Sequence, residues 1–266
     1  MVKSYNTRLK NICLNKNSRL CIGLDFDLDN MINSNVKNLS SLESFVTDVI
    51  DATVEICPVY KPNFAFYEKY GSKGFKILEK IVSHIDGKSI VIADAKRGDI
   101  GNTSKMYAQS IFDFYNFDAV TLSPYMGSDS INPFLYNESK GVYILCLTSN
   151  TSSKDFQYKF SDDSFLYQDV AKLASSLNKK NNIGLVVGGT NSSKMNSIRN
   201  IDSKLSWLVP GIGVQGGDLK NSVIISNMNS IGIINVSRGI IYNGTQSLDD
   251  IRSAAEAYNK EINKHL

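Results

Sequence analysis

The stretch Asp94-Ala95-Lys96-Arg97-Gly98-Asp99-Ile100-Gly101 directly follows a run of small and apolar residues at 90–93. We interpret this run as a buried strand that ends in a loop. Because side chains two residues apart share one face of a strand, we expect Asp94 and Lys96 to point the same way. Asp99 follows on the loop, within reach of the same place. Three charges at the mouth of a buried strand cost stability, so the pattern indicates a chemical role.

The rest of the chain repeats this alternation of apolar runs and helical patterns. The other strand-like runs lie at residues 20–25, 59–66, 119–124, 141–149, 183–189, 207–213 and 231–238. Helical spacing is found at residues 4–16, 41–57, 71–85, 102–115, 128–136, 164–177 and 192–199, from 218 onward, and at 248–262. Continuous apolar strands are typical of parallel sheets that are covered on both faces.

Eight strand–helix units in 266 residues predict a (β/α)8 TIM barrel, an α/β fold with eight parallel strands. A doubly wound sheet is the alternative, but it would place its glycine-rich loop early, whereas here the loop follows the seventh strand. No linker or low-complexity segment divides the chain. We therefore expect one domain over residues 1–266 with a helical extension at 1–19, and a mobile loop at 150–163.

The bulk composition excludes several classes of function. A net charge of +3 is too small to indicate nucleic acid or an anionic membrane as a partner. The two histidines lie in no motif, which argues against Ser-His-Asp chemistry and a histidine-rich metal site. The four cysteines are far apart, and three lie in apolar runs, which predicts buried free thiols. With no secretory signal and no apolar run of membrane-spanning length, the sequence predicts a cytoplasmic protein.

In a (β/α)8 barrel the active site lies at the carboxyl ends of the strands. The polar residues predicted there are Asp25, Lys61, Asn63, Asp94, Lys96, Ser123, Thr148, Ser149, Gln215 and Arg238. One such residue would be interpreted as a solvated loop side chain, but four charged residues that follow or interrupt apolar runs indicate chemistry. A row of alternating carboxylates and ammonium groups also keeps each group ionised, because every charge has an opposite neighbour.

The glycine-rich segment at residues 210–218 opens a helix after the seventh strand. Glycines let backbone N–H groups approach an anion, and the helix N-terminus adds its dipole. Phosphate sites in these barrels often follow strands seven and eight, and Arg238 ends strand eight, where it can make a bidentate contact. Without Arg238, a tight turn would explain the glycines equally well. The two features together predict a site for a small phosphorylated substrate.

Residues 94–100 resemble the D-x-K-x-x-D signature of the orotidine 5′-phosphate decarboxylase family. The short signature also occurs in related sugar-phosphate barrels, but other segments resemble the same family in the same order, and the full set is much more specific. These segments are Leu24-Asp25, Lys61-Pro62-Asn63-Phe64-Ala65-Phe66, Thr148-Ser149-Asn150, Pro210-Gly211-Ile212-Gly213-Val214-Gln215-Gly216-Gly217 and Ser237-Arg238-Gly239.

The resemblance implies decarboxylation of orotidine 5′-monophosphate to uridine 5′-monophosphate, the last step of de novo pyrimidine synthesis, with neither cofactor nor metal. It implies that Lys96 protonates C6 of the pyrimidine while Asp94 lies against the substrate carboxylate. It further implies that Asp25 and Lys61 bind the ribose, with Asn63 beside them in the substrate site, and that Lys61 also pairs with Asp94. Ser149 is implied to contact the base, and Gln215 and Arg238 the phosphate. Asp99, Ile100 and Thr103 are implied to come from the neighbouring subunit of a homodimer.

Two other functions stay open from the residues alone. The first is a metal-dependent sugar-phosphate aldolase or decarboxylase on the same barrel. It would need further carboxylate ligands, and no Glu is found at the ends of strands one to four. The second is a barrel that binds a phosphorylated ligand without turnover, which the charged stretch at residues 94–99 argues against.

Overall fold

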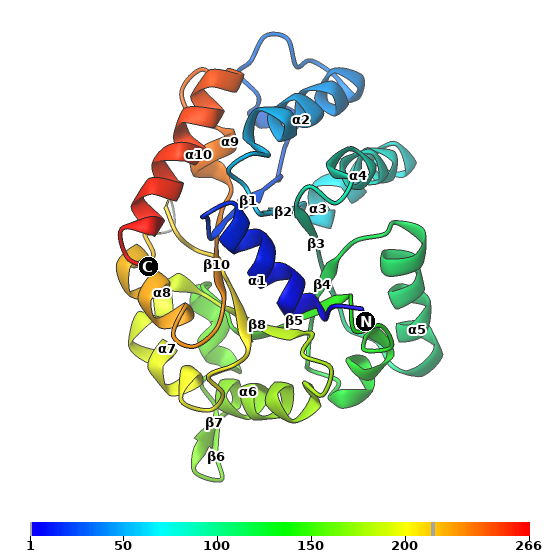
Figure 1. Cartoon of the computed structure of the whole chain (residues 1–266). Coiled ribbons are helices and arrows are strands. Elements are labelled where there is room, and N and C mark those ends of the chain that lie inside the picture. Colours follow the sequence, from blue (N-terminus) through cyan, green and yellow to red (C-terminus); the bar gives the residue numbers. More distant parts are fainter. Residues whose placement is uncertain (1, 214–215) are drawn as a thin grey trace.

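In the computed structural model, which describes residues 2–213 and 216–266, eight parallel strands of the described chain close into a barrel (Figure 1). The order around the barrel is β1, β2, β3, β4, β5, β8, β9 and β10, so each strand pairs with its neighbours in the chain and β10 closes on β1. The predicted (β/α)8 fold is confirmed. The remaining two strands, β6 and β7, form a separate antiparallel hairpin.

The barrel strands are short and mostly buried. Their bounds are β1 (Leu20–Gly23), β2 (Val59–Lys61), β3 (Ile90–Arg97), β4 (Ala119–Leu122), β5 (Gly141–Leu147), β8 (Ile183–Val187), β9 (Ser206–Val209) and β10 (Gly232–Val236); the hairpin is β6 (Phe160–Ser161) and β7 (Ser164–Phe165). The helices are α1 (Tyr5–Asn15), α2 (Leu39–Thr53), α3 (Phe64–Glu68), α4 (Ser72–Ile85), α5 (Gly101–Gln109), α6 (Leu166–Leu177), α7 (Ser192–Arg199), α8 (Leu219–Ser226), α9 (Arg238–Ile241) and α10 (Leu248–Asn263).

Helix α1 lies across one end of the barrel (Figure 1). Its buried side chains Tyr5, Leu9 and Cys13 recur at helical spacing and pack in one apolar cluster with Cys21 of β1 and Val59 of β2. The helix predicted at the N-terminus is confirmed, and it covers the end of the barrel at which the strands begin. The opposite end, where the strands finish, is left open for a site.

The four cysteines, all in the described part of the chain, are buried and form no disulfide, as the sequence predicts. Burial raises the pKa of Cys13 and of Cys57 to about 12. Both thiols therefore stay protonated near neutral pH. This protonation agrees with packing rather than nucleophilic roles.

Several predicted elements differ from the structure. The run at residues 59–66 is not one strand: β2 ends at Lys61, and the Asn63 side chain accepts the N–H of Ala65 and starts helix α3. Residues 128–136 form two 3₁₀ turns instead of a helix. The segment at 150–163, predicted as a mobile loop, contains a 3₁₀ turn and strand β6. Such local hydrogen bonds are poorly visible in hydrophobic periodicity.

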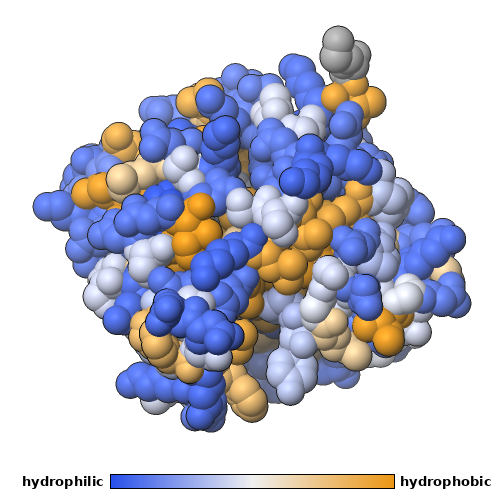
Figure 2. Space-filling model, turned by 90° about the horizontal axis from the view of Figure 1, so that it is seen from below, coloured by the Kyte–Doolittle hydropathy of each residue, from blue (hydrophilic) through white to orange (hydrophobic). Residues whose placement is uncertain are grey.

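Seen from below, the surface carries apolar patches among mostly hydrophilic residues (Figure 2). Across residues 2–213 and 216–266, the helices are all too short or too polar to cross a bilayer.

Candidate active site

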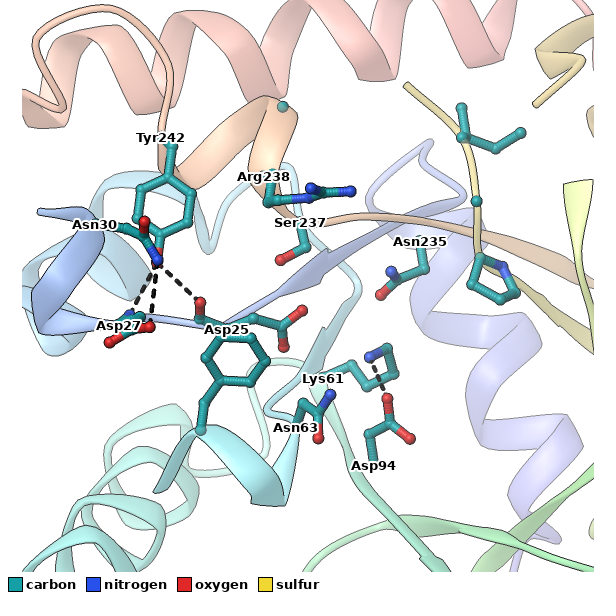
Figure 3. A pocket seen from close by; sticks show the side chains of 15 residues that line it. Asp25, Asp27, Asn30, Lys61, Asn63, Asp94, Asn235, Ser237, Arg238 and Tyr242 are labelled. Atoms are coloured by element: carbon teal, nitrogen blue, oxygen red, sulfur yellow. Dashed lines mark hydrogen bonds and ion pairs between the residues drawn. The ribbon is translucent and has the colours of Figure 1, made fainter. Parts of the chain in front are cut away.

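A pocket of about 500 Å³ opens at the carboxyl ends of the barrel strands. Five of the residues predicted for the site line it, namely Asp25, Lys61, Asn63, Asp94 and Arg238. Residues 210–212 of the glycine-rich segment form another part of its wall. Figure 3 shows the side chains of Asp25, Lys61 and Arg238 pointing into the same space. The barrel thus joins strand ends that are up to about two hundred residues apart in the chain.

Two charged residues that line the pocket, Lys61 and Asp94, form a continuous chain of ion pairs with Lys96 beside it. The ammonium of Lys61 donates to Asp94 Oδ2 at 2.7 Å, and the ammonium of Lys96 donates to Asp94 Oδ1 at 2.6 Å. Lys61 is 4% exposed and Asp94 is 9% exposed, whereas 48% of the Lys96 side chain is exposed. The Asp94 carboxylate therefore bridges one buried and one accessible ammonium group.

The two buried partners hold each other in the charged state. Burial opposes ionisation of Asp94, but the lysines at positions 61 and 96 outweigh it and hold the pKa of Asp94 well below its usual range. Burial likewise opposes the charge on Lys61, but the carboxylates of Asp94 and Asp25 outweigh it and raise its pKa above the usual range. The alternation of charge expected from the sequence is therefore present, and it keeps these groups ionised at neutral pH.

Lys96 reaches Asp94 through an irregular backbone rather than a regular strand. Its φ angle is +47°, in the left-handed region that non-glycine residues rarely adopt. The pairing of β3 with β4 shifts there, because Ala93 faces Val120 while Arg97 faces Leu122. The predicted approach of Lys96 to Asp94 is confirmed, but the cause is this bulge and not simple alternation along a strand.

Asp25 offers an unused acceptor to the pocket. Its Oδ1 atom is buried and has no hydrogen-bond partner among the described residues, although a buried carboxylate oxygen ordinarily has one. Its backbone is fixed by Tyr242, whose hydroxyl donates to the Asp25 carbonyl at 3.1 Å and accepts the N–H of Asp27 at 2.8 Å. A ligand hydroxyl that enters the pocket would satisfy the Asp25 oxygen.

The glycine-rich segment and Arg238 meet at the same pocket wall. A Cβ atom at position 217 would lie 2.4 Å from the carbonyl oxygen of Gly211, so this turn requires glycine. Asp218 caps the helix α8 that follows by accepting the N–H of Asn221. Arg238 begins the short helix α9, which the sequence did not predict. The predicted phosphate ligand Gln215 lies outside the described residues.

Seven predicted residues are not among the described residues that line the pocket: Lys96, Asp99, Ile100, Thr103, Ser123, Thr148 and Ser149. Lys96 is joined to the pocket through its contact with Asp94. Asp99 accepts the backbone N–H of Ile100 through its own Oδ1 at 2.8 Å. Ile100 is 48% exposed, and Thr103 is exposed on α5. Ser149 lies beside Gly188, at the end of the neighbouring strand. Within one chain, Asp99, Ile100 and Thr103 do not complete the site.

The structure adds site residues that sequence reasoning missed. Thr121 on β4 donates to Asp94 Oδ1 at 3.0 Å, and Asn235 on β10 lines the pocket next to Ser237. Tyr242 supports Asp25, as described above. The available signal was a polar residue inside an apolar strand run for Thr121 and Asn235, since such a residue must be satisfied when buried. Nothing local in the sequence marks Tyr242.

Within residues 2–213 and 216–266, no group of three or more His, Cys, Asp or Glu side chains is placed to hold a metal ion. The metal-dependent alternative would need such a group.

An eight-stranded parallel barrel with alternating carboxylates and lysines at its open end, beside a glycine-rich turn and an arginine, is typical of (β/α)8 enzymes that act on small phosphorylated substrates. Residues 18–258 match the model of the orotidine 5′-phosphate decarboxylase / HUMPS family. The chain belongs to this family.

Named relatives agree with this assignment. Over 97% of both chains, the sequence is 44% identical to orotidine 5′-phosphate decarboxylase of Dehalococcoides mccartyi. It is 40% identical to the Bacteroides fragilis enzyme of the same name, over 94% of this chain and 93% of the relative. The structure of Leishmania donovani OMP decarboxylase superposes with a TM-score of 0.85 at 36% identity and covers 98% of each chain. The two other functions left open by the residues have no support among these relatives.

Proposed function

We propose that the chain decarboxylates orotidine 5′-monophosphate to uridine 5′-monophosphate and CO₂ in pyrimidine biosynthesis, without a cofactor and with Lys96 as the proton donor. The observation that carries the proposal is the chain of ion pairs from Lys61 through Asp94 to Lys96 in a barrel of the decarboxylase family. The pairs place a charged, accessible ammonium beside a buried carboxylate, which is the arrangement that this reaction requires.

The pocket can bind the three parts of the nucleotide separately. Arg238 and the N–H groups of the glycine-rich turn would bind the phosphate, together with Gln215. The free Oδ1 of Asp25 would accept a ribose hydroxyl, with Lys61 and Asn63 beside it. The pyrimidine would then lie toward Asp94 and Lys96, with Ser149 near the base. The phosphate is remote from the reacting carbon, but its binding energy can still favour the transition state.

In the chemical step, the bond between C6 and the carboxylate carbon breaks and CO₂ leaves. The electron pair remains on C6 and takes a proton from the Lys96 ammonium, which completes uridine 5′-monophosphate. The ring offers no simple position to accept this pair, so a fixed cation must stabilise it. Asp94 holds that ammonium in place at 2.6 Å. Because the Lys96 side chain is half exposed, water can restore its proton after each turnover.

Asp99, Ile100 and Thr103 fit a shared site in a homodimer. All three lie at or before the start of α5, outside the pocket of their own chain. Ile100, Met106 and Tyr107 place exposed apolar surface on the same segment, as an interface needs. We propose that Asp99 of the partner subunit completes the row of charges beside Lys96. A single domain over residues 1–266 and a cytoplasmic location belong to the same proposal.

The direct test follows the loss of orotidine 5′-monophosphate absorbance with purified wild type, Lys96→Ala and Lys73→Ala. Lys73 is a matched control, since it is exposed on α4 and does not line this pocket. We expect wild type and Lys73→Ala to agree within about twofold, and Lys96→Ala to lose about 10²–10⁴-fold in kcat. A wild type without turnover would overturn the proposed function. A wild-type rate for Lys96→Ala would overturn only the role of Lys96.

A further inference from the structure

Thr121 makes two hydrogen bonds that join the central residues of the site. Its side chain is 1% exposed on β4. Oγ1 donates to Asp94 Oδ1 at 3.0 Å and accepts the backbone N–H of Lys96 at 3.0 Å. A threonine hydroxyl has one proton, which Thr121 donates to Asp94. A lone pair of the same oxygen therefore accepts the backbone N–H of Lys96. One side chain thus holds the carboxylate of one residue and the backbone of the other.

The bulge in β3 explains why this hydroxyl is needed. From Ala93 to Arg97 the strand advances four residues, while the facing strand advances two, from Val120 to Leu122. The extra residues of a bulge lose their regular ladder partners. The N–H of Asp94 keeps its regular parallel bond to the carbonyl of Pro62, next to β2, whereas the N–H of Lys96 is bonded to the side chain of Thr121. The hydroxyl replaces a missing backbone acceptor.

The hydroxyl of Thr121 also affects where the Lys96 ammonium lies. A left-handed φ of +47° is unfavourable for lysine and persists only when surrounding contacts determine it. The bond to Thr121 is one such contact. Loss of this bond would free the backbone at Lys96 and remove the donor that orients Asp94 Oδ1. Both changes move the ammonium relative to a bound substrate.

We propose that Thr121 is a positioning residue, which sets the placement of the Lys96 ammonium and the Asp94 carboxylate for proton transfer without touching the substrate. The inference rests on the proposed function for its kinetic readout. The backbone conformation that Thr121 is proposed to hold, the left-handed φ angle of Lys96, can be measured without any assay of activity.

The test compares Thr121→Val, which keeps the shape but removes the hydroxyl, with Thr121→Ser, which keeps the hydroxyl. The matched control is Thr53→Val, because Thr53 is also buried with a doubly bonded hydroxyl, to Val49 and Tyr60, but lies at the end of α2. The measurements are kcat and KM for orotidine 5′-monophosphate, and the Kd of uridine 5′-monophosphate. Because ångström-scale misplacement of a reacting group can cost about 10²-fold, we expect Thr121→Val to lose about 10- to 100-fold in kcat.

The Kd of uridine 5′-monophosphate should stay within about threefold of wild type in Thr121→Val, since phosphate and ribose contacts are untouched. Thr121→Ser and Thr53→Val should keep kcat within about threefold. Thr121→Val with kcat near wild type, or Thr121→Ser that loses as much as Thr121→Val, would overturn the inference. If the valine variant does not fold, Thr121→Ala carries the same comparison.

A crystal structure of Thr121→Val separates this inference from the proposed function. We expect Lys96 to leave the left-handed region, or its ammonium to move away from Asp94 Oδ1. If the φ angle stays near +47° and the contact near 2.6 Å, the inference is wrong whatever the enzyme turns over. If wild type does not decarboxylate the nucleotide, the proposed function fails and this structure alone decides the role of Thr121.

Discussion

Asp94→Asn should destabilise the protein strongly, because it removes the charge that compensates a buried ammonium. Lys61 is 4% exposed and lies 2.7 Å from Asp94 Oδ2. Breaking a buried pair by neutralising one partner typically costs about 3–5 kcal/mol, since the other charge stays buried. Asn keeps the size of Asp, so no cavity contributes. Because a protein's free energy of unfolding is usually about 5–15 kcal/mol, this loss should be easily measured in an unfolding experiment at neutral pH.

The pH dependence of that loss gives the sharper signature. The pKa of Asp94 is lowered by folding, so its contribution is present above its unfolded pKa of about 4 and is lost as pH falls. The pKa of Lys61 is raised, so its contribution is present below its unfolded pKa of about 10 and is lost at higher pH. In Asp94→Asn, only the Asp25 carboxylate still opposes the effect of burial on Lys61, so we expect the pKa of Lys61 to fall and folding to improve as that lysine loses its proton. The difference in the free energy of unfolding between wild type and Asp94→Asn should therefore be smaller at about pH 9.5 than at about pH 7.

The assay is equilibrium urea unfolding of wild type, Asp94→Asn and Glu256→Gln at both pH values. Glu256 is the matched control because it pairs with Arg252 at 2.9 Å while both side chains are about half exposed. Such a helical surface pair contributes about 0.3–0.5 kcal/mol. A buried Lys61–Asp94 pair is excluded if Asp94→Asn lowers the free energy of unfolding no more than Glu256→Gln does. It is also excluded if the difference between Asp94→Asn and wild type does not shrink at the higher pH.

Three further predictions concern the substrate, the shared site and the metal question. Arg238→Ala should raise KM about 10- to 100-fold, because hydrogen bonds to a charged phosphate are lost; an unchanged KM would place the phosphate elsewhere. Lys96→Ala and Asp99→Ala, each inactive alone, should regain about a quarter of wild-type activity after their subunits are mixed and exchanged, and no recovery would exclude a shared site. Dialysis against EDTA should leave the rate unchanged, whereas a loss that Mg²⁺ restores would favour the metal-dependent alternative.

The barrel could be predicted because its strands are continuous apolar runs and its helices carry regular apolar spacing. The meeting of Lys61 and Asp94 follows from the same logic, since both lie at the carboxyl ends of neighbouring parallel strands. Where local hydrogen bonds compete with periodicity, the predictions were less accurate. Asn63 ends a strand by capping a helix. Helix α2, predicted from residue 41, begins at Leu39 because the Asn38 side chain caps it.

The fine geometry of the site depends on contacts between distant parts of the chain. The left-handed backbone of Lys96 reflects the offset between β3 and β4, and no local pattern reveals that offset. The support of Asp25 comes from Tyr242, which lies more than two hundred residues later. Asp99 illustrates a different limit, because its proposed partner lies in another subunit. The sequence therefore predicts which groups meet, and the structure shows how they are held.

In the proposed reaction, this pocket removes the carboxylate from C6 and Lys96 supplies the replacing proton. The most direct measurement is turnover of orotidine 5′-monophosphate by wild type in D₂O, with the nucleotide product analysed by mass spectrometry and NMR. Because the Lys96 ammonium exchanges with solvent, we expect one CO₂ to be released and one deuterium to be found at C6 for each nucleotide consumed. Absence of CO₂ release, or a product without deuterium at C6, would contradict it.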